Sequence, residues 1–238
     1  MHQFEINRYV KLDLFGLDAS FTNSSAYMIA ALVVVLGFLT MAMNNRALVP
    51  SRMQSIAELS YEFIANLLRE NVGKEGMKYM PFVFSLFVFI LACNMLGMLP
   101  YSFTVTSHIV VTFALAALVF VVVTMIGFAR HGLRYFKLFV PDGVPFILLL
   151  LIVPIELISY LIRPISLSVR LFANMMAGHT MLKVFAGFVV SLGVFGVVPF
   201  IVTVAFTGLE FVIAFLQAFV FSVLTCIYLS DAVNMHDH

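Results

Sequence analysis

The feature that most constrains this chain is an almost unbroken apolar stretch, which runs from about Val144 to Leu229. It is interrupted only around residues 193–199, which leaves segments of roughly 45 and 35 residues, whereas a perpendicular membrane span needs about 20. Either each segment holds two short spans or each forms one long, strongly tilted helix. No polar loop separates Glu156 from Val190, which favours the long helices and therefore an oblique hairpin.

Composition indicates an all-α integral membrane protein. Hydrophobic residues make up 63% of the 238 and charged residues only 11%, whereas about a quarter of a soluble domain is charged. Lipid leaves backbone groups no water to bond, so apolar runs of this length are expected to be helical. We expect a single membrane domain over residues 1–238. The net charge of +1 argues against a nucleic-acid partner.

The remaining chain predicts four more helices, for about six in all. A polar segment, 1–25, precedes a first span at 26–43, and two further spans occupy 80–129 before the hairpin of 144–238. Between them, residues 52–72 show apolar positions at helical spacing and too much charge to span. This amphipathic helix lies either on the membrane surface or against a partner's soluble domain.

Positive residues predict the orientation, because loops on the cytoplasmic or matrix side carry an excess of lysine and arginine. Arg46 and Arg52 follow the first span, and Arg130, Arg134 and Lys137 follow the third. These loops are expected on that side, and the amino terminus on the opposite one.

Arg170 is the candidate functional residue, since it lies deep inside the apolar stretch. A cation at the bilayer centre costs about 2.5–3.5 kcal/mol on insertion scales. Guanidinium keeps its proton in proteins, so Arg170 requires a partner or water. An arginine at this depth is typical of an ion pathway.

A row of polar groups follows on the last helix. Glu210, Gln217 and Asp231 are separated by seven and fourteen residues and fall within one narrow stripe, which is roughly 31 Å long at 1.5 Å per residue. A spaced row of protonatable and hydrogen-bonding groups suits a proton pathway.

On the preceding helix, Arg170 and Asn174 share a face, whereas His179 lies about 180° from Arg170. His179 is therefore expected to meet Glu210 on the returning helix.

Structural roles are the alternative for most of these groups. Glu210 could pair with His179 or Lys183, and Asn174 and Gln217 could only hydrogen-bond between helices. Glu156 could pair with Arg163, and Asp231 could be a helix-terminal charge. Arg163 and Lys183 are expected to extend towards an interface. Cys93 and Cys226 are too far apart in the sequence to suggest a metal site or a disulfide framework, and we expect no cofactor.

Three segments resemble subunit a of F-type ATP synthases. They are Arg170-Leu-Phe-Ala-Asn-Met-Met-Ala-Gly-His179, Leu216-Gln-Ala-Phe-Val-Phe221 followed by Tyr228-Leu229, and Asn94-Met-Leu-Gly-Met-Leu-Pro-Tyr-Ser102. The resemblance extends, in order and spacing, from the first span to the end of the chain.

The resemblance implies a membrane stator beside a rotating ring of c subunits, each carrying one carboxylate at mid-membrane. Protons reach the ring through one aqueous half-channel and leave through another, and ring rotation drives ATP synthesis elsewhere in the complex. Arg170 matches the arginine between the half-channels. Its charge favours the ionised ring carboxylate and hinders a direct proton leak.

Further site residues and partners are implied position by position. The uptake half-channel corresponds to Asn174, His179, Glu210 and Gln217, and the release half-channel to Glu156 and Asp231. The partners would be the c-ring, b-type peripheral-stalk subunits and other Fo subunits, and the chain itself would not catalyse ATP chemistry. Some bacterial members carry Glu and His where this chain has His179 and Glu210. This exchange favours the mitochondrial inner membrane, with the bacterial plasma membrane as the alternative.

Two other classes stay open on the residues alone. One is a self-contained ion-coupled transporter or channel, although no internal repeat is apparent. The other is a structural membrane subunit of a respiratory complex, in which Arg170 is merely paired. Co-purification with a c-ring would distinguish the stator subunit implied by the resemblance from both of these classes.

Overall fold

The computed structural model describes residues 8–10, 13–14, 17–18, 21–44, 50–99, 102–140 and 146–234, and within these it is built almost wholly from helices. The six α-helices are α1 Asn23–Asn44, α2 Arg52–Asn71, α3 Met80–Gly97, α4 Ile109–His131, α5 Phe146–Ser191 and α6 Val197–Val233. The short 3₁₀ segments are η2 Lys74–Tyr79, η3 Val105–Ser107, η4 Gly132–Phe139 and η5 Gly193–Gly196. Five of the described helical segments are long and apolar enough to cross a membrane, which confirms the predicted all-α membrane protein.

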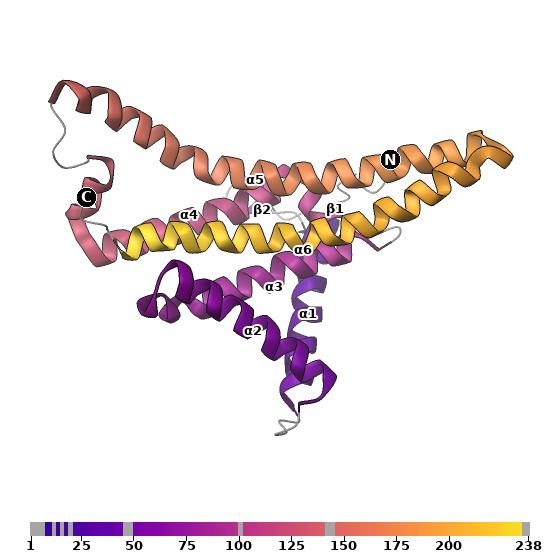
Figure 1. Cartoon of the computed structure of the whole chain (residues 1–238), viewed down its shortest axis with the longest axis horizontal. Helices are drawn as coiled ribbons and strands as arrows, with labels where there is room; N and C mark the ends of the chain where they lie inside the picture. The colour runs from indigo at the N-terminus through magenta and orange to yellow at the C-terminus, as the bar shows by residue number, and fades with distance from the viewer. Residues whose placement is uncertain are drawn as a thin grey trace.

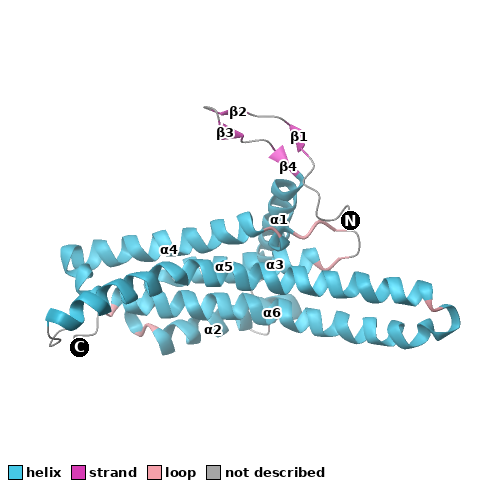
Figure 2. Cartoon of the chain, turned by 90° about the horizontal axis from the view of Figure 1, so that it is seen from above, coloured by secondary structure: helices cyan, strands magenta, loops and turns pink. Residues whose placement is uncertain are grey.

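Four short strands precede α1, and they were not predicted from the sequence. β1 Arg8–Val10 pairs antiparallel with β4 Phe21–Thr22, and β2 Asp13–Leu14 pairs with β3 Leu17–Asp18. In Figure 2 these strands extend from the amino-terminal end of α1. The predicted polar segment 1–25 otherwise lies partly outside the described residues, as do Arg46 and the two ends of the predicted hairpin, 144–145 and 235–238.

The two longest helices form the predicted hairpin. α5 continues through Pro154 and Pro164 without interruption, and its 46 residues extend roughly 69 Å at 1.5 Å per residue. Proline is tolerated inside membrane helices because neighbouring groups satisfy the backbone it frees. Figure 1 shows a bend along α5, and it shows α5 and α6 side by side while α1 crosses them steeply. If α1 stands upright in the bilayer, the hairpin lies oblique to it.

The core lies around α6, which contacts α2, α3, α4 and α5. Phe87 and Ile90 of α3, Val119 of α4, and Phe221 and Leu229 of α6 are buried there. On α5 a buried stripe at four-residue spacing is formed by Leu167, Leu171 and Met175. Because these residues occupy the inner face of α5, residues such as Arg170 lie on its outer face.

The predicted amphipathic helix is α2, and the rest of the protein buries only part of it. The Ser51 side chain caps its start by accepting from the Gln54 amide at 3.4 Å. Ile64 and Leu68 pack into the core, whereas Ile56 and Leu59 remain exposed. The choice between a membrane surface and a partner as the contact for the exposed half therefore remains a prediction.

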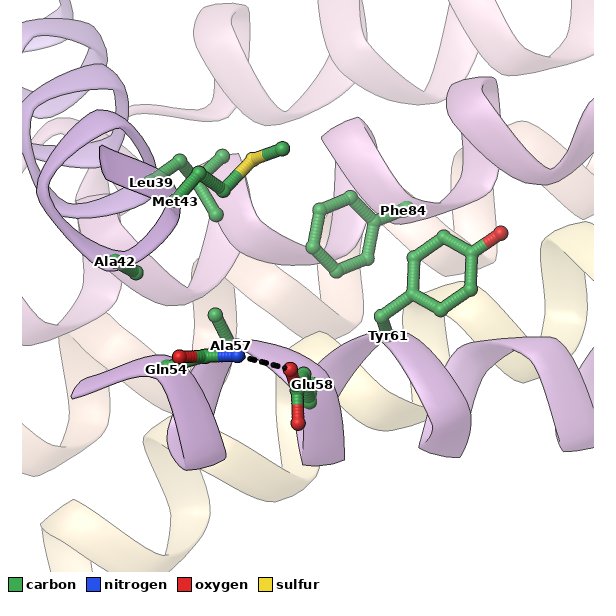
Figure 3. Close-up of a pocket in the computed structure, with 8 residues that line it drawn as sticks. All are labelled: Leu39, Ala42, Met43, Gln54, Ala57, Glu58, Tyr61 and Phe84. Atoms are coloured by element: carbon green, nitrogen blue, oxygen red, sulfur yellow. Dashed lines mark hydrogen bonds between the residues drawn. The ribbon is translucent and has the colours of Figure 1, made fainter. Parts of the chain in front are cut away.

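A groove of about 370 Å³ lies between α1, α2 and α3 (Figure 3). Apolar side chains such as Leu39, Met43 and Phe84 line it. Two of its polar side chains pair with each other, since the Gln54 side-chain amide donates to Glu58 at 2.8 Å. The groove is formed by helices other than α5 and α6, so it does not belong to the predicted proton path.

The carboxyl end of α6 is fixed to its neighbours by polar contacts. Arg130, at the end of α4, forms an ion pair with Glu75 of η2 and donates to the Val233 carbonyl at 3.3 Å. Asn234 donates to the Val72 carbonyl at 2.9 Å. These contacts place the end of α6 beside the basic end of α4, the side on which the lysine and arginine excess was predicted.

Candidate functional site

Three polar pairs cross the interface between α5 and α6. Asn174 Nδ2 donates to Gln217 Oε1 at 2.6 Å. His179 Nδ1 lies 3.7 Å from Glu210 Oε1, and Arg163 Nη1 donates to Asp231 Oδ2 at 2.8 Å. The predicted stripe of α6 therefore faces α5 along its whole length, and the predicted meeting of His179 with Glu210 is confirmed.

Arg170 lies near the middle of the membrane span Leu148–Ser191, on the exposed face of α5. Asn174, one helical turn later, is the nearest residue in the sequence that belongs to one of the cross-helix pairs. Within the described part of the chain, Arg170 makes no hydrogen bond or ion pair. The partner that the sequence predicted for this charge is therefore not supplied by the described residues, and the guanidinium is presented outwards.

The pair of His179 and Glu210 is enclosed, with side chains 12% and 6% exposed. The absence of a side chain at Gly178 leaves room for Glu210, because a Cβ at position 178 would lie 2.7 Å from Glu210 Oε1. On the other side of the ring, His179 Nε2 lies 3.1 Å from the hydroxyl of Thr104. The imidazole is thus held between a hydroxyl and a carboxyl group, which suits it to exchange protons.

Polar side chains also lie between the other helices and the hairpin. Asn94 Nδ2 donates to the Ala214 carbonyl at 3.1 Å, and the hydroxyls of Thr112 and Ser168 are 3.2 Å apart. Asn94, Thr112, Ser168 and Ala214 are all buried. The segment that joins α3 to α4 is buried as well: Ser102, Thr104 and Thr106 are at most 8% exposed. Sequence reasoning did not single out Thr104, Thr106 or Thr112.

At the opposite end of the hairpin, Arg163 is held by Asp231 and by two aromatic rings. Its guanidinium carbon lies 5.5 Å from the Tyr160 ring centroid and 5.1 Å from that of Tyr228. Arg163 therefore pairs with Asp231 and not with Glu156, the alternative considered for it, and its extension towards an interface stays a prediction. Contact with two aromatic rings and a carboxylate stabilises the guanidinium charge more than exposure of a lone charge would.

A chain of hydroxyl groups continues from this cluster. Tyr160 Oη lies 3.0 Å from Tyr135 Oη and 2.7 Å from Thr124 Oγ1. Tyr135 itself is 1% exposed and packs against Gly127, where a Cβ would overlap its ring. Together, Tyr135, Tyr160, Arg163, Tyr228 and Asp231 form a clasp that joins η4, α5 and α6. Glu156 is half-buried and lies outside this clasp.

Removing either charge of the clasp is expected to destabilise the assembled protein. Arg163→Ala or Asp231→Ala leaves the other charge without its partner. A hydrogen bond to a charged group contributes about 1.5–3 kcal/mol, so the partial exposure of this pair leaves an expected loss of roughly 1–2 kcal/mol. The temperature at which the purified complex dissociates measures it. The double variant should lose less than the two single losses combined.

Glu156→Ala is the matched control, because no ion pair of Glu156 occurs among the described residues. It should leave the dissociation temperature unchanged. Strictly additive single losses would show that Arg163 and Asp231 do not stabilise one another.

No group of three or more His, Cys, Asp or Glu side chains that could hold a metal ion occurs in the described ranges. Cys93 and Cys226 are both buried as free thiols.

Comparison with known proteins places this arrangement in a family. The family model described as ATP synthase A chain matches residues 25–230. An "ATP synthase subunit a" from Rhizobium leguminosarum bv. trifolii is 60% identical over 244 aligned positions, covering 100% of this chain and 98% of the relative. "ATP synthase subunit a 1" from Brucella anthropi is 58% identical over 241 positions, covering 98% of this chain and 97% of the relative. The chain, with its exposed mid-span arginine and its row of polar pairs, therefore belongs to the ATP synthase A chain family.

Proposed function

We propose that this chain is the proton-translocating stator subunit of an F-type ATP synthase. The single observation that carries the proposal is the position of Arg170: a permanent charge at mid-span, facing outwards, beside a row of polar pairs. A charge at this depth requires a partner in the membrane. A carboxylate on a neighbouring ring of c subunits would supply it, and the names of the relatives agree with that assembly.

In this proposal Arg170 separates two half-channels. A proton taken up through the first neutralises a ring carboxylate, which can then leave the arginine and enter the lipid. When that carboxyl group returns to the second half-channel it loses the proton, because the guanidinium favours its ionised form. The permanent charge also makes a direct proton passage between the half-channels unfavourable.

Residues are assigned to the half-channels by their place along the hairpin. Asn174, Gln217, His179 and Glu210 would form the uptake side; they make two adjacent cross-helix pairs next to Arg170. Glu156 and Asp231 would line the release side, at the end where α6 terminates. The Arg163 ion pair holds Asp231 in place on that side.

The proposed partners are the c-ring, b-type peripheral-stalk subunits and the other Fo subunits, with the chain itself taking no part in ATP chemistry. The relatives reported above are bacterial, so we place the complex in the bacterial plasma membrane rather than the mitochondrial inner membrane. The amino terminus would then face the periplasm, since Arg46 and Arg52, which follow α1, and Arg130 at the end of α4 would face the cytoplasm.

Cross-linking tests whether the exposed face of α5 meets the ring. Ala173 lies one turn from Arg170 on that face, and a photoreactive amino acid placed there should cross-link to c subunits in native membranes. Val33, which is 63% exposed on α1, is the matched control and should give no c-subunit product. Mass spectrometry of the products identifies the partner. A product with another protein, or none while the complex assembles, would contradict the stator assignment and favour the other two classes.

A further inference from the structure

We propose that Thr104 is a positioning residue, which holds the His179 ring in the tautomer that turns an unprotonated Nδ1 towards Glu210. The structural part of this inference stands on the geometry alone. Its consequence for proton transfer rests on the proposed function.

Thr104 reaches the hairpin from a distant part of the sequence. It lies just before η3, in the short buried segment that joins α3 to α4, and it is 2% exposed. Its hydroxyl is 3.1 Å from His179 Nε2 and 3.2 Å from the carbonyl oxygen of Gly97. A single hydroxyl group thus lies between a backbone acceptor and an imidazole nitrogen.

The tautomer follows from where the single hydroxyl proton of Thr104 goes. We assign this proton to the Gly97 carbonyl, which can only accept, so the hydroxyl accepts from the ring. In this assignment His179 Nε2 carries the hydrogen. A neutral imidazole has only one N–H group, so Nδ1 presents a lone pair. Nδ1 is the nitrogen that lies 3.7 Å from Glu210 Oε1.

This arrangement defines the proton exchange between the two side chains. When Glu210 is protonated, its O–H bond can break as an N–H bond forms at Nδ1, which leaves a carboxylate beside an imidazolium. The reverse step restores the starting pair. A separation of 3.7 Å is longer than a hydrogen bond, so the transfer requires a small approach of the groups or one bridging water. With the other tautomer, Nδ1–H would meet the protonated acid and no transfer could begin.

The fold fixes Thr104 tightly enough for this role. Gly97 admits it, because a Cβ at position 97 would lie 2.9 Å from Thr104 Cγ2. The Ser107 hydroxyl donates to the Thr104 carbonyl at 2.7 Å, and the Ser102 hydroxyl lies 2.7 Å from the carbonyl oxygens of Leu96 and Leu99 at the end of α3. Backbone and side-chain contacts therefore hold the Thr104 hydroxyl in one place.

The test is a pair of substitutions in the assembled complex. Thr104→Val keeps the shape and removes the hydroxyl, whereas Thr104→Ser keeps the hydroxyl. ATP-driven acidification of inverted vesicles is expected to fall about 10-fold in the valine variant, by analogy with the lower end of the loss when the partner that orients a metal-binding histidine is removed. The serine variant should restore it to near the wild-type rate. In a His179→Gln background, Thr104→Val should cause no further loss.

A spectroscopic measurement tests the tautomer independently of pumping. In ¹⁵N-histidine-labelled complex in liposomes, His179 is identified by the signal that His179→Gln removes. Its ring should show the Nε2-protonated form in wild type and a mixture of tautomers in Thr104→Val. A wild-type ring protonated at Nδ1, or spectra unchanged by Thr104→Val, would overturn the inference. If the tautomer depends on Thr104 while Arg170→Ala still pumps, the positioning role holds and the proposed function fails.

Discussion

Replacing Arg170 with alanine is expected to abolish ATP-driven proton pumping while the complex still assembles. The side chain is exposed and makes no hydrogen bond or ion pair within the described part of the chain, so no described packing depends on its charge. What it stabilises is expected to be the ionised ring carboxylate. Removing one preorganised charge-stabilising group usually costs a factor of about 100–1,000 in rate, and pumping should fall at least that far.

Acidification of inverted vesicles, monitored with a pH-sensitive dye, measures this loss. Arg134→Ala is the matched control, because Arg134 is also exposed but lies in η4, away from the hairpin interface. It should pump normally. Arg170→Lys keeps a positive charge that can lose its proton, so it should retain little activity. Normal pumping by an assembled Arg170→Ala complex would remove the basis for the half-channel assignments.

Replacing Glu210 with glutamine is expected to cause the second-largest loss, about 100-fold in pumping, since acid–base catalysis by one positioned group contributes about 100–10,000-fold. The amide keeps the shape of the side chain but cannot exchange a proton with His179. Because Glu210 is buried beside His179, no solvent-exposed acid can replace it. Vesicle acidification and ATP synthesis driven by an imposed pH gradient should fall together.

Gly178→Ala tests the same pair without removing a titratable group. Its methyl group would displace the end of the flexible Glu210 side chain, so pumping should fall while assembly is preserved. Gly187→Ala is the control: it lies on the opposite face of α5, with nothing within 4 Å of its Cβ position. Equal activity in Glu210→Gln and wild type would exclude Glu210 from the proton path.

Length and periodicity were sufficient to predict the hairpin and most of its polar face. Two apolar segments longer than a normal span predicted the long helices. Polar residues seven and fourteen positions apart predicted the face of α6 that lies against α5. The helical angle alone separated His179 from Arg170 and directed it to Glu210, as the structure confirms. These features depend on the regular geometry of a single helix, which sequence spacing determines.

Contacts between distant segments could not be predicted in this way. Thr104 and His179 are 75 residues apart, and Arg163 and Asp231 are 68 apart. Whether Arg163 pairs with Glu156 or with Asp231 depends on the register between α5 and α6 along the hairpin. No local sequence pattern determines that register. The cluster of Ser and Thr at residues 102–107 was a usable signal, because so many hydroxyls in one short turn between two spans need buried partners.

In the proposed function, a hairpin lying oblique in the bilayer would affect the electrical work done on each proton. An α5 of roughly 69 Å fitted to a hydrocarbon core of about 30 Å gains only about 0.65 Å of depth per residue. The 11 residues from Arg163 to Asn174 would then differ in depth by only roughly 7 Å. If water reaches the Arg163–Asp231 pair from one side and the Asn174–Gln217 pair from the other, nearly the whole membrane voltage falls across the layer of roughly 7 Å between them, which contains Arg170. Each proton then gains about 2.3 kcal/mol per 100 mV at the point where the ring turns.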